Sequence, residues 1–312
     1  MLRRRESTTL PLIVIVAATF SLFPGCDRDR ATSAAATTQA TRPITKPTVA
    51  SLSPAGTDLL IGMGAGDHLI AVSNWDAENP QTKGLPRVGD YRTIDRERLT
   101  TIKPDLVVVQ ERPDKIQPGT VEFITASLHA QMVNIQIVTL KDVFDATQVL
   151  GDAIGTPDRA KAAADKLRAD LDVVKQSVAG KPPVRVYIAR SQNGLDSVGG
   201  GNFVDDVLTI AGGTNVLSGG HNSFPTVDRE QLVKLDPEVI LHLLPAASPQ
   251  AVERAKQFWA GMPSLKAVKA GRVYVLDEYF VLQPSLRLGD TARLFAARLH
   301  GVQVPASVRE GR

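Results

Sequence analysis

The side chains that could carry chemistry in this sequence show no catalytic or metal-binding spacing. No Gly-x-Ser-x-Gly, His-Glu-x-x-His or Cys-x-x-Cys motif occurs. The five histidines, at positions 68, 129, 221, 242 and 300, are too scattered to form a ligand set. The stretch GMGAGD at 62–67 resembles part of a dinucleotide loop, but it ends a predicted helix where such a loop would begin one. The sequence therefore argues against catalysis and against a bound cofactor.

A short stretch with an acidic start occurs twice. The first copy, DRERLTTIKPDLVVVQ, begins at Asp95, and the second, DREQLVKLDPEVILHL, begins at Asp228. Each copy predicts a short helix with an acidic cap, a stop at a proline and a strand. The helix dipole favours acids at any helix start, but the same phase in both copies indicates two similar halves.

Short apolar strands alternate with helices from Thr48 onward, which favours parallel α/β packing. One long helix between Thr156 and Gly180 separates two such series. The predicted strands cover 48–53, 68–73, 105–110, 135–140, 184–189, 239–241 and 273–280. The predicted helices include 95–102, a stretch near 118–131, 142–155, one from about 203, and 285–300. An earlier helix has Thr57 as its expected N-cap. The fold class is therefore α/β, with two Rossmann-like lobes joined by one long rigid α-helix.

The N-terminus predicts export and attachment to a membrane. Three arginines precede the apolar stretch 10–23, which is too short to span a bilayer comfortably. LFPGC ends at Cys26, the sole cysteine, which excludes a disulfide within the chain and resembles a lipoprotein signal. An ordinary signal peptide cleaved nearby and a short N-terminal anchor are the alternatives. The predicted organisation is a signal peptide at 1–25, a flexible Ala/Thr-rich tether at 26–47, lobes at 48–155 and 181–312, and the joining helix at 156–180.

The composition is that of an ordinary soluble globular protein, with 43% hydrophobic and 22% charged residues. The formal net charge is +3, and the arginines of the N-terminal segment account for most of it. No stripe of lysine and arginine with interleaved aromatic residues occurs. A nucleic-acid partner is therefore not expected.

The landmarks of both halves resemble those of a family of periplasmic binding proteins. The similar motifs are VASLSPAGTDLLIGMGAGDHLIAVS, LPRVGDY, IKPDLVVV, AGGTNVL, REQLVKLDPEVIL and FWAGMPSLKAVKAGRVYVLD. They resemble the binding proteins of ABC importers for vitamin B12, iron-siderophores and haem, and most strongly those for vitamin B12. The resemblance covers about residues 48–300. It implies a ligand cleft between the lobes, no enzymatic activity, and a monomer held by its lipid anchor at the extracytoplasmic face of the cytoplasmic membrane.

The resemblance also assigns a docking role to two acids. Glu97 and Glu230 each stand seven residues before the proline of their copy, where the family has exposed glutamates that contact arginines of the permease. Two similar lobes would meet two copies of one permease subunit, so the same contact is needed twice. The implied partner is an ABC permease dimer with its ATPase subunits.

The implied ligand residues are three aromatic residues and an acid. Tyr91 and Phe224 take the places of cleft tryptophans of the vitamin B12 binders, and Trp75 falls where the family contributes another aromatic residue. Asp277 matches an acidic pocket residue, although Val281 replaces its arginine partner. Aromatic faces suit a large flat ligand, so the prediction is a cobalt corrinoid. Core packing is the alternative for each aromatic residue.

Three other functions stay open at this point. A ferric siderophore or haem is the first, because Arg87, Arg92 and Arg190 could face an anionic ligand. An enzyme with a two-lobed α/β cleft is the second, and a surface interaction lipoprotein is the third.

Overall fold

The computed structural model of the chain describes residues 46–90, 92–220 and 222–305. The predicted signal peptide, Cys26, most of the predicted tether and Tyr91 lie outside these residues. In the described part, no helix has both the length and the apolar character needed to cross a membrane.

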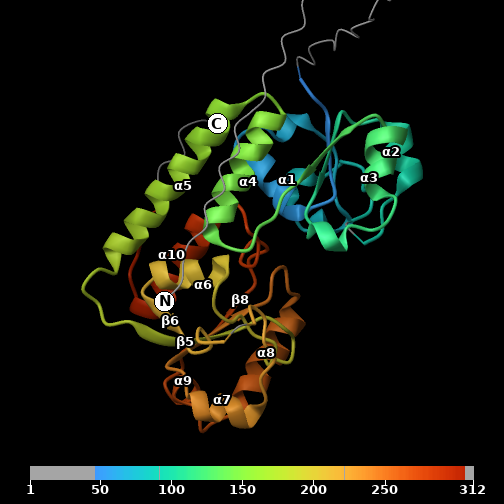
Figure 1. The fold of residues 1–312 in the computed structure, drawn as a ribbon. Helices are drawn as coiled ribbons and strands as arrows, with labels where there is room; N and C mark the ends of the chain where they lie inside the picture. Colours follow the sequence, from blue (N-terminus) through green and yellow to red (C-terminus); the bar gives the residue numbers. More distant parts are fainter. Residues whose placement is uncertain (1–45, 91, 221, 306–312) are drawn as a thin grey trace, which may run out of the picture. The chain divides into compact units, whose positions relative to one another are not determined.

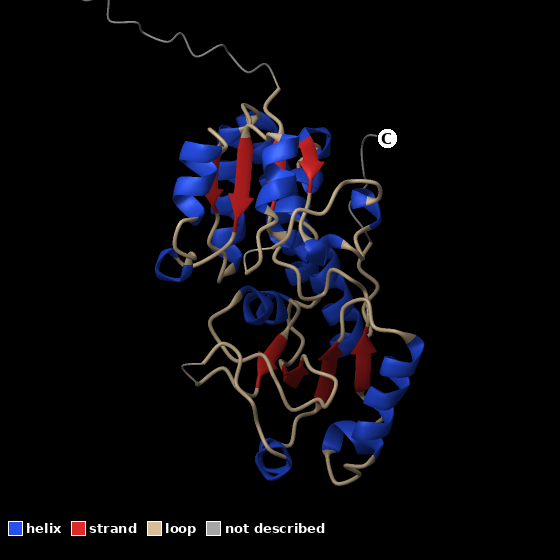
Figure 2. Cartoon of the chain, turned by 90° about the vertical axis from the view of Figure 1, so that its right-hand side faces the viewer, coloured by secondary structure: helices blue, strands red, loops and turns tan. Residues whose placement is uncertain are grey.

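Two four-stranded sheets form the framework, and both are parallel throughout (Figures 1 and 2). The first has the order β2-β1-β3-β4 and the second the equivalent order β6-β5-β7-β8. The strands of the first sheet are β1 Val49–Ser51, β2 Leu69–Ala71, β3 Leu106–Val109 and β4 Gln131–Asn134. Those of the second are β5 Val184–Ala189, β6 Gly213–Asn215, β7 Val239–Leu243 and β8 Val273–Leu276. The prediction of two parallel α/β lobes is thus confirmed.

Helices connect the strands and flank the sheets (Figure 2). The α-helices are α1 Pro54–Gly62, α2 Arg96–Ile102, α3 Thr120–Glu122, α4 Leu140–Ala153, α5 Pro157–Ser177, α6 Phe203–Ile210, α7 Arg229–Leu235, α8 Pro249–Ala260, α9 Lys266–Lys269 and α10 Leu288–His300. The 3-10 helices are η1 Gly66–His68, η2 Asn74–Asp76, η3 Pro80–Thr82 and η4 Pro113–Lys115, and Phe123–Ser127 forms a π-helix. The predicted helical stretch near 118–131 is therefore shorter than expected and of mixed type.

The strand predicted at 135–140 is wrong, because β4 ends at Asn134. Ile135 still donates its amide to the first sheet, and its side chain is buried. Beyond it, Val138 accepts a hydrogen bond from the amide of Phe203 (2.8 Å), and the amide of Leu140 donates to Asp206 (2.8 Å). The backbone of this segment therefore bonds to the start of α6 instead of extending a sheet.

The N-cap predicted at Thr57 is also wrong. Helix α1 begins at Pro54, and the Ser53 side chain accepts a hydrogen bond from the Gly56 amide (3.1 Å). Proline suits the first helical position because its missing amide would have had no partner there. Thr57 lies one turn further in, where its hydroxyl donates to Asp76.

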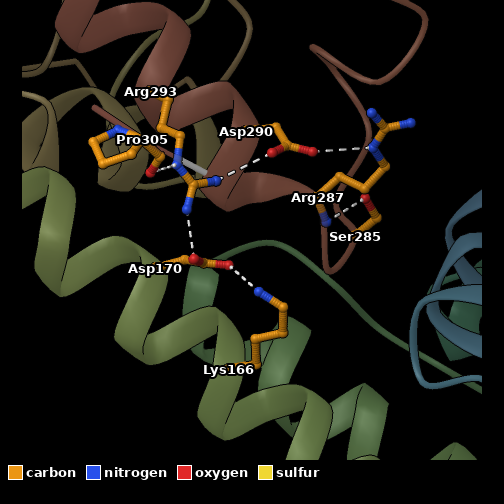
Figure 3. A network of polar contacts seen from close by, with 7 residues as sticks. All are labelled: Lys166, Asp170, Ser285, Arg287, Asp290, Arg293 and Pro305. Carbon is orange, nitrogen blue, oxygen red and sulfur yellow. Dashed lines mark hydrogen bonds and ion pairs between the residues drawn. The ribbon is translucent and has the colours of Figure 1, made fainter. Parts of the chain in front are cut away.

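Helix α5 follows the first sheet in the chain and packs against α4 and α10 (Figure 1). A Cβ atom at Gly151 of α4 would lie 2.3 Å from that of Ala160, and one at Gly289 of α10 would lie 2.9 Å from Cβ of Asp170. Asp170 also forms an ion pair with Arg293 of α10 (Figure 3). Small residues and a buried ion pair thus bring both neighbouring helices close to α5.

One apolar cluster includes residues from both sheets and from α5. Val49 and Val108 of the first sheet, Leu167 of α5, and Val186 and Leu241 of the second sheet all belong to it. The two sheets therefore share a hydrophobic core through the helices that connect them.

Candidate functional site

The repeated sequence forms the same local structure in α2 and α7. The side chains of Asp95 and Asp228 each cap their helix by accepting a hydrogen bond from the third helical amide, at 2.9 Å and 2.7 Å. Leu99 and Leu232, one turn later, are fully buried. Both helices hold an acid at the second helical position with its side chain in solvent.

The ends of the two copies also match. Lys103 and Asp236 end their helices in the left-handed conformation, with φ of 53° and 39°. The acid after each proline then binds the start of the neighbouring strand. Asp105 accepts from the amide of Thr48 (2.8 Å), and Glu238 accepts from the amide of Arg185 (2.9 Å). The repeat therefore encodes one helix-stop-strand unit at the same position of each sheet.

Glu97 of α2 and Glu230 of α7 are the exposed acids of these units. Glu230 forms an ion pair with Lys234 (2.9 Å), in which both side chains are mostly in solvent. Such a pair is weak enough to exchange partners. The geometry is that of two accessible carboxylates, and their docking role stays a prediction.

Phe224 lies in residues 222–226, the Phe224 segment, whose backbone carbonyls accept several hydrogen bonds. Its ring is 44% exposed, and the Arg190 guanidinium stands over it at 4.8 Å. The amide and the hydroxyl of Ser197 both donate to the carbonyl of Pro225, at 2.9 Å and 2.6 Å. The Gly199 amide donates to the carbonyl of Ser223 (2.9 Å). These hydrogen bonds therefore fix the backbone on either side of the exposed ring.

Two buried asparagines, which the sequence patterns did not indicate, add hydrogen bonds to the backbone around this segment. The Asn202 amide group donates to the carbonyls of Gly199 (3.0 Å) and Ser223 (3.3 Å). The Asn215 amide group donates to the carbonyls of Val198 and Gly199, both at 3.0 Å. A Cβ atom at Gly199 would lie 2.2 Å from a backbone oxygen of the Phe224 segment, so this position requires glycine. The run GGGN at 199–202 was the available signal.

Trp75 stands out from η2 with 67% of its surface exposed, so core packing does not explain it. Asp76 of η2 and Asp58 of α1 are buried. Desolvation by burial raises the pKa of Asp58 to about 7 and that of Asp76 to about 6. Sequence reasoning missed both acids, since carboxylates near helix starts are usually solvated.

Asp277 is exposed and directly follows β8. Its carbonyl accepts a hydrogen bond from Ala246 (2.9 Å), which has a positive φ of 54° in the loop after β7. Val281, which replaces the family's arginine, is fully buried in the apolar core. The structure thus gives Asp277 no cation at that position.

Trp75, Phe224 and Asp277 each follow the carboxyl end of a strand, namely β2, β6 and β8. Ligands of parallel α/β sheets bind at this edge. Among the described residues, neither a ring contact nor a hydrogen bond joins the three side chains to one another. A pocket of about 300 Å³ lies elsewhere, along α10, and none of the three lines it.

The described histidines do not form a metal or catalytic site. His242 is fully buried, accepts a hydrogen bond from the Trp259 indole at Nδ1 (3.0 Å) and bonds the Ser191 carbonyl through Nε2 (2.6 Å). Burial lowers the pKa of His242, and both ring nitrogens are engaged inside the protein, so the ring has a structural role. Over the described ranges, no cluster of His, Cys, Asp and Glu could hold a metal ion.

The fold and the two halves define a class of two-lobed solute-binding proteins, and comparison with known sequences supports this class. The model of the periplasmic binding protein family matches residues 49–280, so the chain belongs to that family. It is a binding protein and not an enzyme, and family membership implies a periplasmic location.

Individual relatives agree with this assignment. The vitamin B12-binding protein of Vibrio cholerae is 26% identical over 249 residues, which cover 80% of this chain and 87% of the relative. That of Salmonella paratyphi A is 28% identical over 222 residues, covering 71% and 80%.

Solved structures show the same fold. The periplasmic vitamin B12-binding protein of Vibrio cholerae superimposes with a TM-score of 0.68 at 25% identity, covering 82% of this chain and 97% of that one. A periplasmic haem-binding protein of Pseudomonas aeruginosa gives a TM-score of 0.69 at 23% identity, covering 84% and 95%. The latter likeness concerns the fold alone.

Proposed function

We propose that this chain is the substrate-binding lipoprotein of an ABC importer and that it captures a corrinoid of the vitamin B12 type. The observation that carries the proposal is the similarity to vitamin B12-binding proteins along most of the chain. The exposed rings of Trp75 and Phe224, each after one strand of a different sheet, support it because large flat ligands bind to aromatic faces.

Two of the three arginines that could face an anionic ligand, Arg87 and Arg190, favour a corrinoid over an anionic iron chelate. Arg87 donates to the Ser73 carbonyl and the Thr82 hydroxyl, both at 3.3 Å, so its guanidinium is engaged in hydrogen bonds within the protein. Arg190 covers the ring of Phe224. A ferric siderophore or haem is therefore the second candidate and an outcome of the binding test.

Titration with cobalamin tests the ligand directly. We expect saturable quenching of the tryptophan fluorescence of the wild-type protein. Phe224→Ala should weaken binding by about tenfold, which corresponds to the loss of one stacking face. Phe144→Ala is a control that removes a ring of α4 that lies under the Arg168 guanidinium of α5. Tight binding of haem or a ferric siderophore, with no response to cobalamin or cobinamide, would contradict the proposal.

Delivery requires a second interaction, for which we propose the two exposed glutamates. Glu97 and Glu230 occupy equivalent places in equivalent units, as an interface with two copies of one permease subunit needs. Their exposure and the weak pairing of Glu230 with Lys234 leave both carboxylates accessible to arginines.

We further propose that Cys26 carries the lipid that holds the protein at the membrane. Cys26→Ser should release the protein into the soluble fraction or leave it unprocessed, because the cysteine thiol is the acylation site. Mass spectrometry and membrane fractionation measure both effects. Ser33→Ala is a matched control within the predicted tether. An unchanged mass and an unchanged membrane fraction would exclude lipidation at this residue.

A further inference from the structure

Residues 73–82, the Trp75 segment, are attached to α1 by buried polar groups. The Asp76 carboxyl accepts hydrogen bonds from the Thr57 hydroxyl of α1 (3.0 Å) and from the Ser73 amide (2.9 Å). The Asn79 side chain donates to the Asp58 carboxyl of α1 (2.6 Å). Two carboxyl groups, one on each side of the contact, therefore hold this segment.

Both carboxyl groups lie out of water. Asp58 is 7% exposed and Asp76 is 2% exposed. One Asp58 oxygen, Oδ2, is buried and has no hydrogen-bond partner in the described part of the chain. An ionised oxygen without a partner is far less favourable there than a neutral one. The geometry thus favours a protonated Asp58.

The charges that face these groups are few. Asp76 raises the pKa of Asp58 and Arg287 lowers it, while Arg87 lowers that of Asp76. Arg287 lies against the Phe280 ring (3.9 Å) and pairs with Asp290. Desolvation is the largest influence on the pKa of both carboxyl groups. At Asp76 it exceeds the hydrogen bonds from Thr57 and Ser73, which lower the pKa, as well as the effect of Arg87.

We propose that Asp58 and Asp76 are positioning residues for the ligand: they hold the Trp75 segment against α1 while protonated and release it as the pH rises. The ligand role rests on the proposed function, whereas the holding of the segment rests on the contacts alone.

The direction of the pH effect follows from linkage. In a released segment both carboxyl groups would titrate near their ordinary value of 3.8, whereas in the held segment they titrate at about 7 and about 6. Both pKa values are raised, so the attachment is strongest below about pH 4 and weakens as the pH rises to about 7. Each proton lost on release changes the equilibrium by about tenfold per pH unit.

Hydrogen exchange measures this equilibrium without any ligand. The amides of Asp76, Asn79 and Thr82 form hydrogen bonds within the segment and report its release. After correction for the intrinsic exchange rate, we expect their protection to fall by at least about tenfold per pH unit between about pH 5 and about pH 7. Protection of the β7 amides should stay constant. A constant protection of the segment as well would overturn the proposal.

Variants separate the role of charge from that of structure. Asp58→Asn keeps an acceptor for Asn79 and should remove one proton from the pH dependence, and adding Asp76→Asn should remove the rest. Asp58→Leu has no acceptor and should lower protection at every pH. Glu78→Gln, an exposed acid of the same segment, should behave like the wild type. An unaltered pH dependence in the double Asn variant would refute the assignment to these acids.

Cobalamin affinity links the segment to the ligand. We expect wild-type affinity to be weaker at about pH 8 than at about pH 6, in proportion to the fraction of released segment, and the double Asn variant to lose this difference. A pH-dependent exchange profile without cobalamin binding at either pH would overturn the proposed function and the ligand role together. Cobalamin binding with pH-independent exchange would overturn the positioning role alone.

Discussion

Reversal of both exposed acids, in the double variant Glu97→Arg and Glu230→Arg, is expected to abolish coupling to the permease while cobalamin affinity stays unchanged. A contact at two points gains about 10²- to 10⁴-fold in avidity over either point alone, so each single variant should lose a large part of it. The double variant also places cations opposite the expected arginines. Ligand-dependent stimulation of the ATPase in a reconstituted transporter measures the loss.

A matched control places the same charge change elsewhere in both halves. Glu122 and Glu253 are exposed acids outside the repeated units, and their double reversal to arginine should leave ATPase stimulation intact. Full stimulation by the Glu97/Glu230 variant would rule out the docking proposal. Loss of cobalamin binding in that variant would instead place these acids at the ligand site.

The second large effect concerns the ion pair between α5 and α10. The side chains of Asp170 and Arg293 retain only 10% and 12% of their exposure, and Lys166 and Asp290 extend the network (Figure 3). Arg293→Ala removes the buried cation that pairs with Asp170, while the more exposed Lys166 stays, which should lower the free energy of unfolding by about 3 kcal/mol. Urea denaturation followed by tryptophan fluorescence measures the change.

Two further variants identify the cause of that loss. Arg293→Met combined with Asp170→Leu buries no charge and should recover most of the stability. Lys161→Ala, which removes an exposed ion pair on the same helix, should have no measurable effect. If Arg293→Ala were as stable as the wild type, the ion pair would not hold α10 to α5.

The sequence predicts the elements whose signals are local and periodic. The repeated units show this best, because a capping acid, a buried leucine and a proline each act within one turn of chain. The sequence predicts a long helix between Thr156 and Gly180, and the helix is observed at Pro157–Ser177. The parallel arrangement followed from the alternation of strands and helices, and the equal order of both sheets agrees with the repeat.

Local sequence patterns fail to predict a secondary structure that depends on contacts with residues far away in the chain. The apolar alternation at 135–140 predicted a strand, yet this backbone bonds to the start of α6, more than sixty residues further along the chain. At Ser53, a proline at the following position was the better signal for a helix start than the hydroxyl of Thr57. The burial of Asp58 depends on the contacts between α1 and residues 73–82. The local pattern around Asp58 does not predict these contacts.

The apolar cluster that includes residues of both sheets opposes separation of the sheets when a bound molecule leaves. Pulling the sheets apart would expose this cluster to water, at about 25 cal/mol for each Å² of apolar surface. Residues 73–82 and 222–226 lie outside this cluster, so we expect the residence time of a ligand to depend on them and not on wide opening of the two sheets. We therefore expect a bound molecule to leave through local motion of these segments while the distance between the two sheets stays the same.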